Sequence, residues 1–262
     1  MIFSTKDVNT LNQNRDKVVV LPLGAIEQHG PHLPVGTDTH IITALSLALE
    51  GELSEDVVLC PSLPFGSSHH HLDFGGTISI SPTLYTALIV ELVESLLKYG
   101  FQKIVLLNGH GGNITPVRQA LSVLSNQTES TYPANIVLAT YWEVAGKPFA
   151  GAPPMESPAL SHACEYETSL MLHIYPDQVL MDNVQRAQRP PSNGYIAWED
   201  DEPYRGISIV RSTAYISSNG SSGEPQLGTK EKGEHLFKEA LQALVNFVAE
   251  FKDWPLMERL KK

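Results

Sequence analysis

The sequence predicts a single α/β domain over residues 1–262, in which helices cover both faces of a mostly parallel β-sheet to give three layers, α/β/α. Short segments rich in valine, isoleucine and leucine alternate along the chain with longer segments of helical periodicity, as in doubly wound folds. Hydrophobic residues make up 42% of the chain and charged residues 18%, which is typical of a protein with one packed core. A chain of 262 residues is also of the size expected for one large α/β domain.

The alternation begins near the N-terminus. The first predicted strand is Lys17–Leu23 (KVVVLPL), which is apolar on both faces, as buried parallel strands are. A loop containing glycine and proline follows. Thr39–Leu49 then places isoleucine and leucine at helical spacing, and Thr37 or Asp38 is available as the N-cap.

The same pattern continues through the middle of the chain. Asp56–Cys60 (DVVLC) is the second predicted strand. Pro82–Tyr99 is a predicted helix, because proline suits its opening position and Gly100 stands just past its end. Lys103–Leu107 (KIVLL) is the third predicted strand, and it leads into the glycine-rich turn 108–113 (NGHGGN).

The last part of the chain completes the predicted layers. Val117–Leu124 has apolar periodicity, and Asn135–Thr140 (NIVLAT) is the fourth predicted strand. A final amphipathic helix is predicted over about Lys230–Phe251. Gly146–Ala159 and Val184–Gly206 combine proline with other loop-forming or charged residues, and we interpret both as long functional loops.

Composition excludes several classes of partner and location. Lys and Arg number 18 against 29 Asp and Glu, so the formal net charge is −11, and neither nucleic acid nor an anionic membrane is an expected partner. The sequence has neither a secretory signal nor an apolar segment of membrane-spanning length, which predicts a cytoplasmic protein. Cys60 and Cys164 form no CxxC pair and are expected to be reduced thiols without a disulfide.

Four candidate metal ligands follow two of the predicted strands. Glu27 and His29 come just after the first strand, two residues apart, so an extended chain would point both side chains to one side. Asp38 follows a loop that can fold back, and His110 comes just after the third strand. Because sites in open α/β sheets form beside the carboxyl ends of the strands, we expect all four to meet in one crevice. Taken alone, Asp38 is an N-cap and NGHGGN a tight turn, but their coincidence favours a site.

This donor set suits zinc, manganese or iron, and a bridging aspartate is typical of hydrolytic two-metal sites. A second ion needs a further carboxylate, for which Glu165 and Glu167 are candidates at the start of a predicted helix. Only one of them is expected to reach the ions, because residues two apart do not share a helix face. His162 is the candidate proton carrier, since imidazole titrates near neutral pH.

Other polar and aromatic residues carry weaker signals. The run His69–His71 looks like a chelating sequence, but successive side chains point in different directions, so at most one is expected to enter a site. Trp142, its neighbours Tyr141 and Glu143, and the loop 146–157 are expected to line a substrate pocket, because they follow the fourth strand.

Several motifs together resemble the creatininase (creatinine amidohydrolase) family. They are LPLGAIEQHGPHLPVGTD, GSSHHHLDFGGTISI, NGHGGN, HACEYETSLML and SSGEPQLGTKEKGEHLF, in order over about residues 17–240. The resemblance implies a creatininase-like fold, a binuclear metal centre, hydrolysis of a non-peptide or cyclic C–N amide bond in a small molecule, and a homo-oligomer, often a hexamer. By position it implies metal ligation by Glu27, His29, Asp38 and His110, with Asp38 bridging. It also implies catalytic roles for His162 and Glu167, and places His71 at the histidine before the family's F-x-G-T turn.

One departure from the family pattern bears on the substrate. Family members that act on creatinine carry Tyr-Glu after the second metal histidine, and the Glu is a metal ligand, whereas this chain has Gly111 and Gly112. The missing ligand is therefore assigned to Glu167, and creatinine itself is disfavoured. A formamide hydrolase of cofactor biosynthesis, a peptidase that trims a modified peptide and a sugar-ring hydrolase are the alternatives within the family.

The expected chemistry is attack on the amide carbon by a water that bridges and is activated by two divalent ions. His162 or Glu167 then hands a proton to the leaving nitrogen, and either Asn108 or the backbone N–H groups of the glycine turn are expected to support the developing oxyanion. Trp142 and His71 are the expected side-chain contacts of the substrate. Two rivals stay open: an enzyme with one Fe(II) held by a His/His/carboxylate set, and a non-catalytic binding protein with a structural metal.

Overall fold

Four parallel strands form the central sheet in the computed structural model of the protein, which describes residues 1–128, 133–188 and 212–256. In chain order they are β1 (Val18–Leu23), β2 (Val57–Leu59), β3 (Lys103–Asn108) and β4 (Asn135–Thr140). Their order in the sheet is β2-β1-β3-β4. All four predicted strands are confirmed, each within one residue of its predicted bounds.

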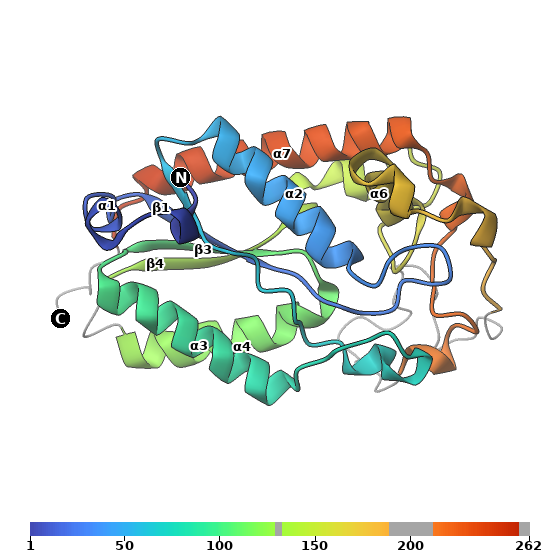
Figure 1. The fold of residues 1–262 in the computed structure, drawn as a ribbon, viewed down its shortest axis with the longest axis horizontal. Helices are drawn as coiled ribbons and strands as arrows, with labels where there is room; N and C mark the ends of the chain where they lie inside the picture. Colours follow the sequence, from blue (N-terminus) through green and yellow to red (C-terminus); the bar gives the residue numbers. More distant parts are fainter. Residues whose placement is uncertain (129–132, 189–211, 257–262) are drawn as a thin grey trace.

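Helices cover both faces of the sheet, as Figure 1 shows. One face packs against α2 (Thr37–Glu52), α6 (Glu165–Ile174) and α7 (Lys230–Asp253), and the other against α3 (Pro82–Tyr99) and α4 (Ile114–Thr128). The strands alternate their apolar side chains between the two resulting cores, since Val18 and Val20 enter one and Val19 and Leu21 the other. The predicted three-layer α/β/α class is confirmed.

Shorter elements complete the described chain. The short α-helices are α1 (Val8–Asn12) and α5 (Tyr141–Ala145). The 3₁₀ turns are Phe3–Thr5, His69–Phe74, Gly111–Asn113, Lys147–Phe149, Pro176–Gln178, Met181–Asn183, Thr213–Tyr215 and Pro225–Leu227. Within the described ranges we find no helix with the length and apolar character needed to cross a bilayer. Cys60 and Cys164 are both buried free thiols.

Helix ends follow the sequence at α3 and depart from it at α2. The Ser81 side chain accepts from the Leu84 N–H, Pro82 opens α3, and Gly100 ends it in the left-handed region with φ 111°. In α2 the N-cap is Gly36, without a side-chain cap, so the prediction that Thr37 or Asp38 caps this helix is wrong. The predicted segment 117–124 is the central part of α4, which is longer at both ends.

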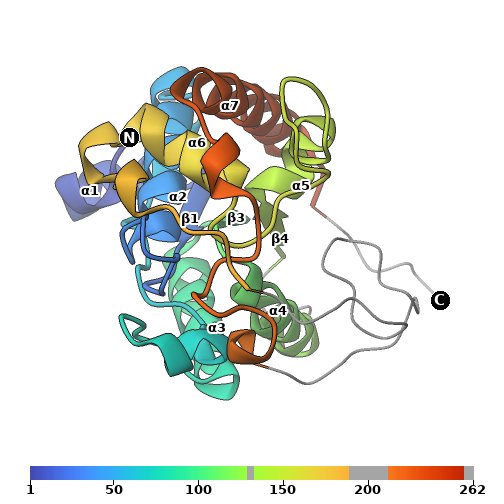
Figure 2. The same ribbon diagram turned by 90° about the vertical axis from the view of Figure 1, so that its right-hand side faces the viewer.

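The loops that follow the strands gather at one end of the molecule, which faces the viewer in Figure 2. β1 and β3 end level with each other, because Leu23 pairs with Asn108, and Asn108 in turn pairs with Thr140 at the end of β4. The residues that come next are therefore neighbours in space although they are far apart in sequence. Most of the predicted loop Val184–Gly206 lies outside the described residues.

Helices α6 and α7 pack closely because Gly233 has no side chain. A Cβ at this position would lie 1.9 Å from the Ser169 carbonyl oxygen on α6, far inside van der Waals contact. We predict that Gly233→Ala lowers the free energy of unfolding by about 1–3 kcal/mol, the usual cost of overpacking. The measurement is urea unfolding followed by circular dichroism.

The matched control is Gly51→Ala, in the last turn of α2. A Cβ there would meet no atom within 4 Å, so alanine should raise stability by about 0.5–1 kcal/mol through its better helix propensity. Equal effects of the two substitutions would contradict the close contact between α6 and α7.

Candidate metal centre

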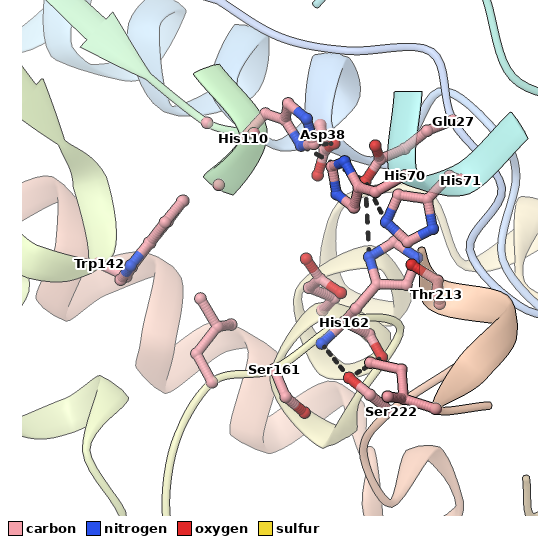
Figure 3. Close-up of a pocket in the computed structure, with 16 residues that line it drawn as sticks. Glu27, Asp38, His70, His71, His110, Trp142, Ser161, His162, Thr213 and Ser222 are labelled. Atoms are coloured by element: carbon pink, nitrogen blue, oxygen red, sulfur yellow. Dashed lines mark hydrogen bonds and ion pairs between the residues drawn. The ribbon is translucent and has the colours of Figure 1, made fainter. Parts of the chain in front are cut away.

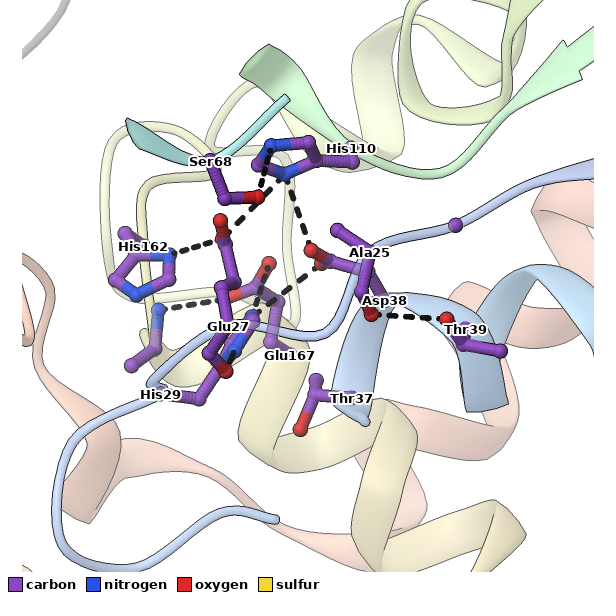
Figure 4. A network of polar contacts seen from close by, with 12 residues as sticks. Ala25, Glu27, His29, Thr37, Asp38, Thr39, Ser68, His110, His162 and Glu167 are labelled. Atoms are coloured by element: carbon purple, nitrogen blue, oxygen red, sulfur yellow. Dashed lines mark hydrogen bonds and ion pairs between the residues drawn. The ribbon is translucent and has the colours of Figure 1, made fainter. Parts of the chain in front are cut away.

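Five acidic and imidazole side chains converge at the carboxyl ends of the strands (Figure 4). Glu27 and His29 come from the loop after β1, Asp38 from the first turn of α2, His110 from the turn after β3, and Glu167 from the first turn of α6. None of these side chains is more than about a tenth exposed, and the His29 side chain is fully buried. The structure thus brings together every residue for which the sequence predicts metal ligation.

His29 points a bare nitrogen at two carboxylates. Its Nδ1 lies 3.0 Å from the Glu27 carbonyl oxygen, which can only accept, so Nδ1 carries the ring proton. Its Nε2 lies 3.3 Å from Asp38 Oδ1 and 3.8 Å from Glu167 Oε1. In the neutral ring, the lone pair of Nε2 faces negatively charged oxygens, and this contact is repulsive. A cation between the nitrogen and the oxygens would remove the repulsion.

His110 repeats this arrangement on the other side of Asp38. Its Nε2 lies 3.2 Å from the Ser67 carbonyl oxygen, to which it donates, so Nδ1 is the bare nitrogen of the neutral ring. Nδ1 lies 3.0 Å from Asp38 Oδ2 and 3.3 Å from Glu27 Oε1. Asp38 therefore offers one oxygen to the His29 side and the other to the His110 side.

The donor atoms fit a pair of cations that share Asp38. Donors on one tetrahedral or octahedral ion with bonds of 2.0–2.2 Å are about 3.0–3.5 Å apart, close to the separations in both groups. Three buried atoms of the cluster, Glu27 Oε2, His29 Nε2 and Asp38 Oδ2, make no hydrogen bond with any described residue. Unsatisfied buried polar atoms are costly, so ligation explains why these groups are buried together.

The electrostatics of the metal-free protein point the same way. Burial alone would lower the pKa of His110, but the charges of Glu27 and Asp38 raise it to about 9. For His29, too, burial is outweighed by Asp38 and Glu167, and the pKa is well above its usual value. Burial raises the pKa of Glu27 to about 7, whereas His29 and His110 overcome burial at Asp38 and lower its pKa. Without cations, protons on the imidazoles balance the carboxylates.

The two glutamates of α6 have separate roles. Glu165 is fully buried and faces away from the centre, where its Oε1 lies 2.6 Å from Lys232 Nζ and its Oε2 accepts from the Ser157 N–H at 2.7 Å. Glu167 directs Oε1 toward His29, and its Oε2 accepts from the Ala163 N–H at 2.5 Å. Glu167 is thus the carboxylate that the fold presents to the metal centre.

A cavity of about 330 Å³ opens beside the cluster (Figure 3). Its lining is mixed polar and apolar, and includes Glu27, Asp38, His70, His71, His110, Gly111, Gly112, Trp142, Leu160, Ser161, His162, Glu167, Thr213, Ile216 and Ser222. Trp142, Gly111, Gly112 and His71, the predicted substrate contacts, all line it. The expectation that Tyr141 and the loop 146–157 line it is wrong, because Tyr141 is buried in the core and no residue of that loop reaches the cavity.

The prediction that at most one of three consecutive histidines enters the site is also wrong. These residues begin a 3₁₀ helix, in which successive side chains are separated by about 120°. His70 and His71 nevertheless both line the cavity, with ring centroids 4.2 Å apart. His69 is the exposed member, and its Nδ1 lies 2.6 Å from Ser79 Oγ.

His162, the predicted proton carrier, is placed at the cavity wall with one nitrogen occupied. Its Nε2 lies 2.7 Å from the Gln28 carbonyl oxygen, to which it donates, and its Nδ1 lies 3.5 Å from Glu27 Oε1. Burial and the charges of His29 and His71 hold the pKa of His162 well below its usual value. The neutral ring therefore presents a bare Nδ1 toward the centre.

The sequence reasoning missed several residues of the site. Ser67 and Ser68 orient His110, since Ser68 Oγ lies 3.1 Å from its Nε2. Thr213 and Ser222 line the cavity from a segment that supplied only part of one motif. Ser222 is the second residue of the SSGEP motif, which was the one available signal, and Thr213 lies eight residues before that motif.

Comparison with known proteins identifies the family of this chain. A family model described as creatininase, creatinine amidohydrolase, matches residues 3–248. The chain belongs to the creatininase family.

Relatives in the creatininase family are hydrolases of more than one kind. The chain is 31% identical over 245 residues to the mycofactocin precursor peptide peptidase of Mycobacterium ulcerans (strain Agy99), which covers 90% of this chain and 86% of that one. It is 24% identical over 246 residues to creatinine amidohydrolase of Pseudomonas putida, covering 90% of each. A crystal structure of creatinine amidohydrolase shares its fold, with a TM-score of 0.81 at 22% identity over 97% of this chain and 98% of that one.

The creatininase-family chain described here has no room for a side chain at position 112. A Cβ on Gly112 would lie 2.2 Å from the Ser67 carbonyl oxygen, 2.4 Å from His110 Nε2 and 3.0 Å from His70 Cε1. The Glu that the family resemblance implies there in creatinine-hydrolysing members is therefore not merely absent. Its space is taken by the Ser67 backbone and the imidazole rings.

The charge balance of the centre predicts a pH dependence that cations reverse. The folded pKa of His110 is about 9, above the value near 6.5 of an unfolded histidine, so its protonation stabilises the metal-free protein below pH 6.5. That stability is lost as pH rises through about 9. We expect the unfolding temperature of chelator-treated protein to fall between pH 6.5 and 9, as measured by differential scanning calorimetry.

The same protein with saturating Zn²⁺ is the control. Cations displace these protons, so the pH dependence between 6.5 and 9 should be weaker or reversed, and ion binding should release protons to the buffer. A metal-free protein whose unfolding temperature stays level or rises over this interval would contradict the assignment.

Proposed function

We propose that the protein is a metal-dependent hydrolase of C–N amide bonds that holds two divalent cations, zinc, manganese or iron, in the centre described above. The single observation that carries the proposal is Asp38, whose two oxygens each face a bare imidazole nitrogen, one from His29 and one from His110. A structural ion needs one closed set of ligands. Two sets that share a carboxylate beside an open cavity favour catalysis.

Each residue of the centre has a role in this proposal. Glu27 and His110 would hold one cation, His29 and Glu167 would hold the other, and Asp38 would offer one oxygen to each. When bound, such ions supply Lewis acidity, which polarises an amide carbonyl and lowers the pKa of water. His162 accepts a proton from the attacking water at Nδ1 and delivers it to the leaving nitrogen. Gly111 and Gly112 line the cavity, and in this proposal their N–H groups support the carbonyl oxygen as it gains charge.

The substrate class follows from the cavity and the relatives. The first candidate is a small non-peptide or cyclic amide, including a formamide, as the family motifs predict. The second is an amide in a peptide, which is favoured by 31% identity to a peptide peptidase against 24% to a creatinine amidohydrolase. Creatinine itself is disfavoured, because Gly112 replaces the glutamate of creatinine-hydrolysing members. We further propose that the chain is one domain, works in the cytoplasm and assembles as a homo-oligomer.

The proposal is tested by metal content and turnover together. Elemental analysis of the native protein should give two ions per chain, and a panel of cyclic amides, formamides and short peptides should contain a substrate. Asp38→Ala should lose both ions and at least about 1,000-fold in kcat/KM, because each cation loses a ligand. One ion per chain with oxygen uptake would favour the Fe(II) rival. A bound metal with no turnover on the whole panel would favour the binding-protein rival.

The two glutamates of α6 provide a matched pair of variants. Glu167→Gln should lower the occupancy of one cation and reduce turnover, because it removes a charged donor that faces His29. Glu165→Gln should keep both cations but lower the unfolding temperature, because it leaves buried Lys232 without its closest carboxylate. Atomic emission and calorimetry on both variants measure these effects. The reverse pattern would assign the ligand to Glu165 instead.

A further inference from the structure

Gln28 lies between two of the proposed ligands and has a fixed amide orientation. Its Nε2 donates to the Gly220 carbonyl oxygen at 2.9 Å, and its Oε1 accepts from the Gly30 N–H at 3.0 Å. Both partners are backbone groups whose donor or acceptor role cannot change. The positions of the amide nitrogen and oxygen of Gln28 are therefore settled by the backbone around them.

The remaining hydrogen of this amide is directed at His71. Gln28 Nε2 lies 2.7 Å from His71 Nδ1, and since Nε2 only donates, Nδ1 must be the acceptor. The neutral His71 ring then carries its proton on Nε2. That nitrogen lies 3.6 Å from Glu27 Oε1, beyond hydrogen-bond length, on the side of the ring that faces the centre (Figure 3).

The backbone of the same residue orients His162. The Gln28 carbonyl oxygen accepts from His162 Nε2 at 2.7 Å, which leaves Nδ1 bare toward Glu27. Gln28 Nε2 also approaches His162 Nε2 at 3.2 Å, but both atoms are donors already committed elsewhere, so this contact is not a hydrogen bond. His71 and His162 thus carry their protons on the same ring atom but present opposite nitrogens to the centre.

Packing around Gln28 shows that this arrangement is tightly constrained. Gly220 has φ +86°, a conformation that favours glycine, and a Cβ there would lie 1.9 Å from Gln28 Oε1. The rings of His71 and His162 stack with centroids 4.1 Å apart and an interplanar angle of 28°. The side chain therefore has no free space in which to turn over.

We propose that Gln28 is a positioning residue that fixes the tautomers of His71 and His162, so that His71 donates an N–H to the carbonyl oxygen of the scissile amide while His162 transfers the proton. This inference rests on the proposed function and adds two assignments to it. Gln28 acts through the histidines, and His71 is a hydrogen-bond donor rather than a metal ligand.

The proton inventory of the step is balanced. The water oxygen bonds to the amide carbon as its proton moves to His162 Nδ1, and the carbonyl oxygen, which gains charge, accepts from His71 Nε2–H. The C–N bond then breaks with its electron pair on nitrogen, which takes the proton from His162 Nδ1. Both rings end as they began, so the tautomers set by Gln28 serve every turnover.

The tautomers proposed for His71 and His162 can be measured in the wild-type protein without any activity assay. ¹⁵N NMR of zinc-loaded protein labelled at the histidine rings should show His71 and His162 with the proton on Nε2, with His71 assigned from His71→Gln. A proton on Nδ1 of His71 would overturn the proposal even if the protein proved to be an active hydrolase. Failure of the proposed function is distinguished by metal content, since a wild type without bound ions contradicts that function and not the tautomers.

Two variants of near-equal size test the role of Gln28. Gln28→Glu replaces the donor with an acceptor, so the proton of His71 should move to Nδ1 in the NMR spectrum. Gln28→Met removes the hydrogen bonds without adding charge, and should lower kcat by about 100-fold while KM stays within about threefold and both ions remain. Gln242→Glu, on the exposed face of α7, is the matched control and should change none of these quantities.

Every result of the two Gln28 substitutions either supports or overturns the proposed role of Gln28. Unchanged ring shifts in Gln28→Glu, or an unchanged kcat in a folded Gln28→Met protein, would show that Gln28 does not set the tautomers or that they do not matter. Loss of an ion in Gln28→Met would make Gln28 a support of the metal centre instead, which also overturns the proposal. Loss of kcat with retained ions and a shifted His71 signal supports it.

Discussion

The arrangement on which the rest of the structure depends is the approach of unprotonated imidazole nitrogens to buried carboxylates. His29 and His110 each donate a hydrogen bond from one ring N–H to a backbone carbonyl oxygen, so the other nitrogen of each neutral ring faces Asp38 with a lone pair. Such contacts are repulsive until positive charge enters the space between them. The fold therefore holds a site whose electrostatic stability requires cations, or protons in their place.

The parallel sheet makes this approach possible. Strands β1 and β3 are neighbours and end level, so the turns that carry Glu27 and His110 begin side by side. Helix α2 packs on one face of the sheet and places Asp38 in its first turn. Helix α6, more than a hundred residues later in the chain, places Glu167 in its own first turn. Each element supplies one or two donors, and the centre exists only when the layers are packed. The proposed binding of ions would be coupled to folding of the domain for this reason.

Sequence patterns predicted the part of this design that is local. Apolar strands and the polar residues just after them are visible in a single sequence, which is why Glu27, His29, Asp38 and His110 were expected to meet. The contacts that separate Glu165 from Glu167 could not be predicted from the sequence. Glu165 pairs with Lys232, which lies on a helix much later in the chain. The second histidine in the cavity was missed because successive side chains were expected to point in different directions, whereas both His70 and His71 of the 3₁₀ helix His69–Phe74 line the cavity. Gln28 was not identified from the sequence, because its role depends on hydrogen bonds to His71 and Gly220, which are distant in the chain.

The crowded backbone at Gly112 constrains how this chain can change during evolution. A side chain at position 112 would have to displace the Ser67 carbonyl and the ring of His110, so a substitution there also requires a change in the surrounding loops. Directed evolution that aims to place a carboxylate in this turn should therefore begin by remodelling the loop that carries the serines rather than the glycine itself.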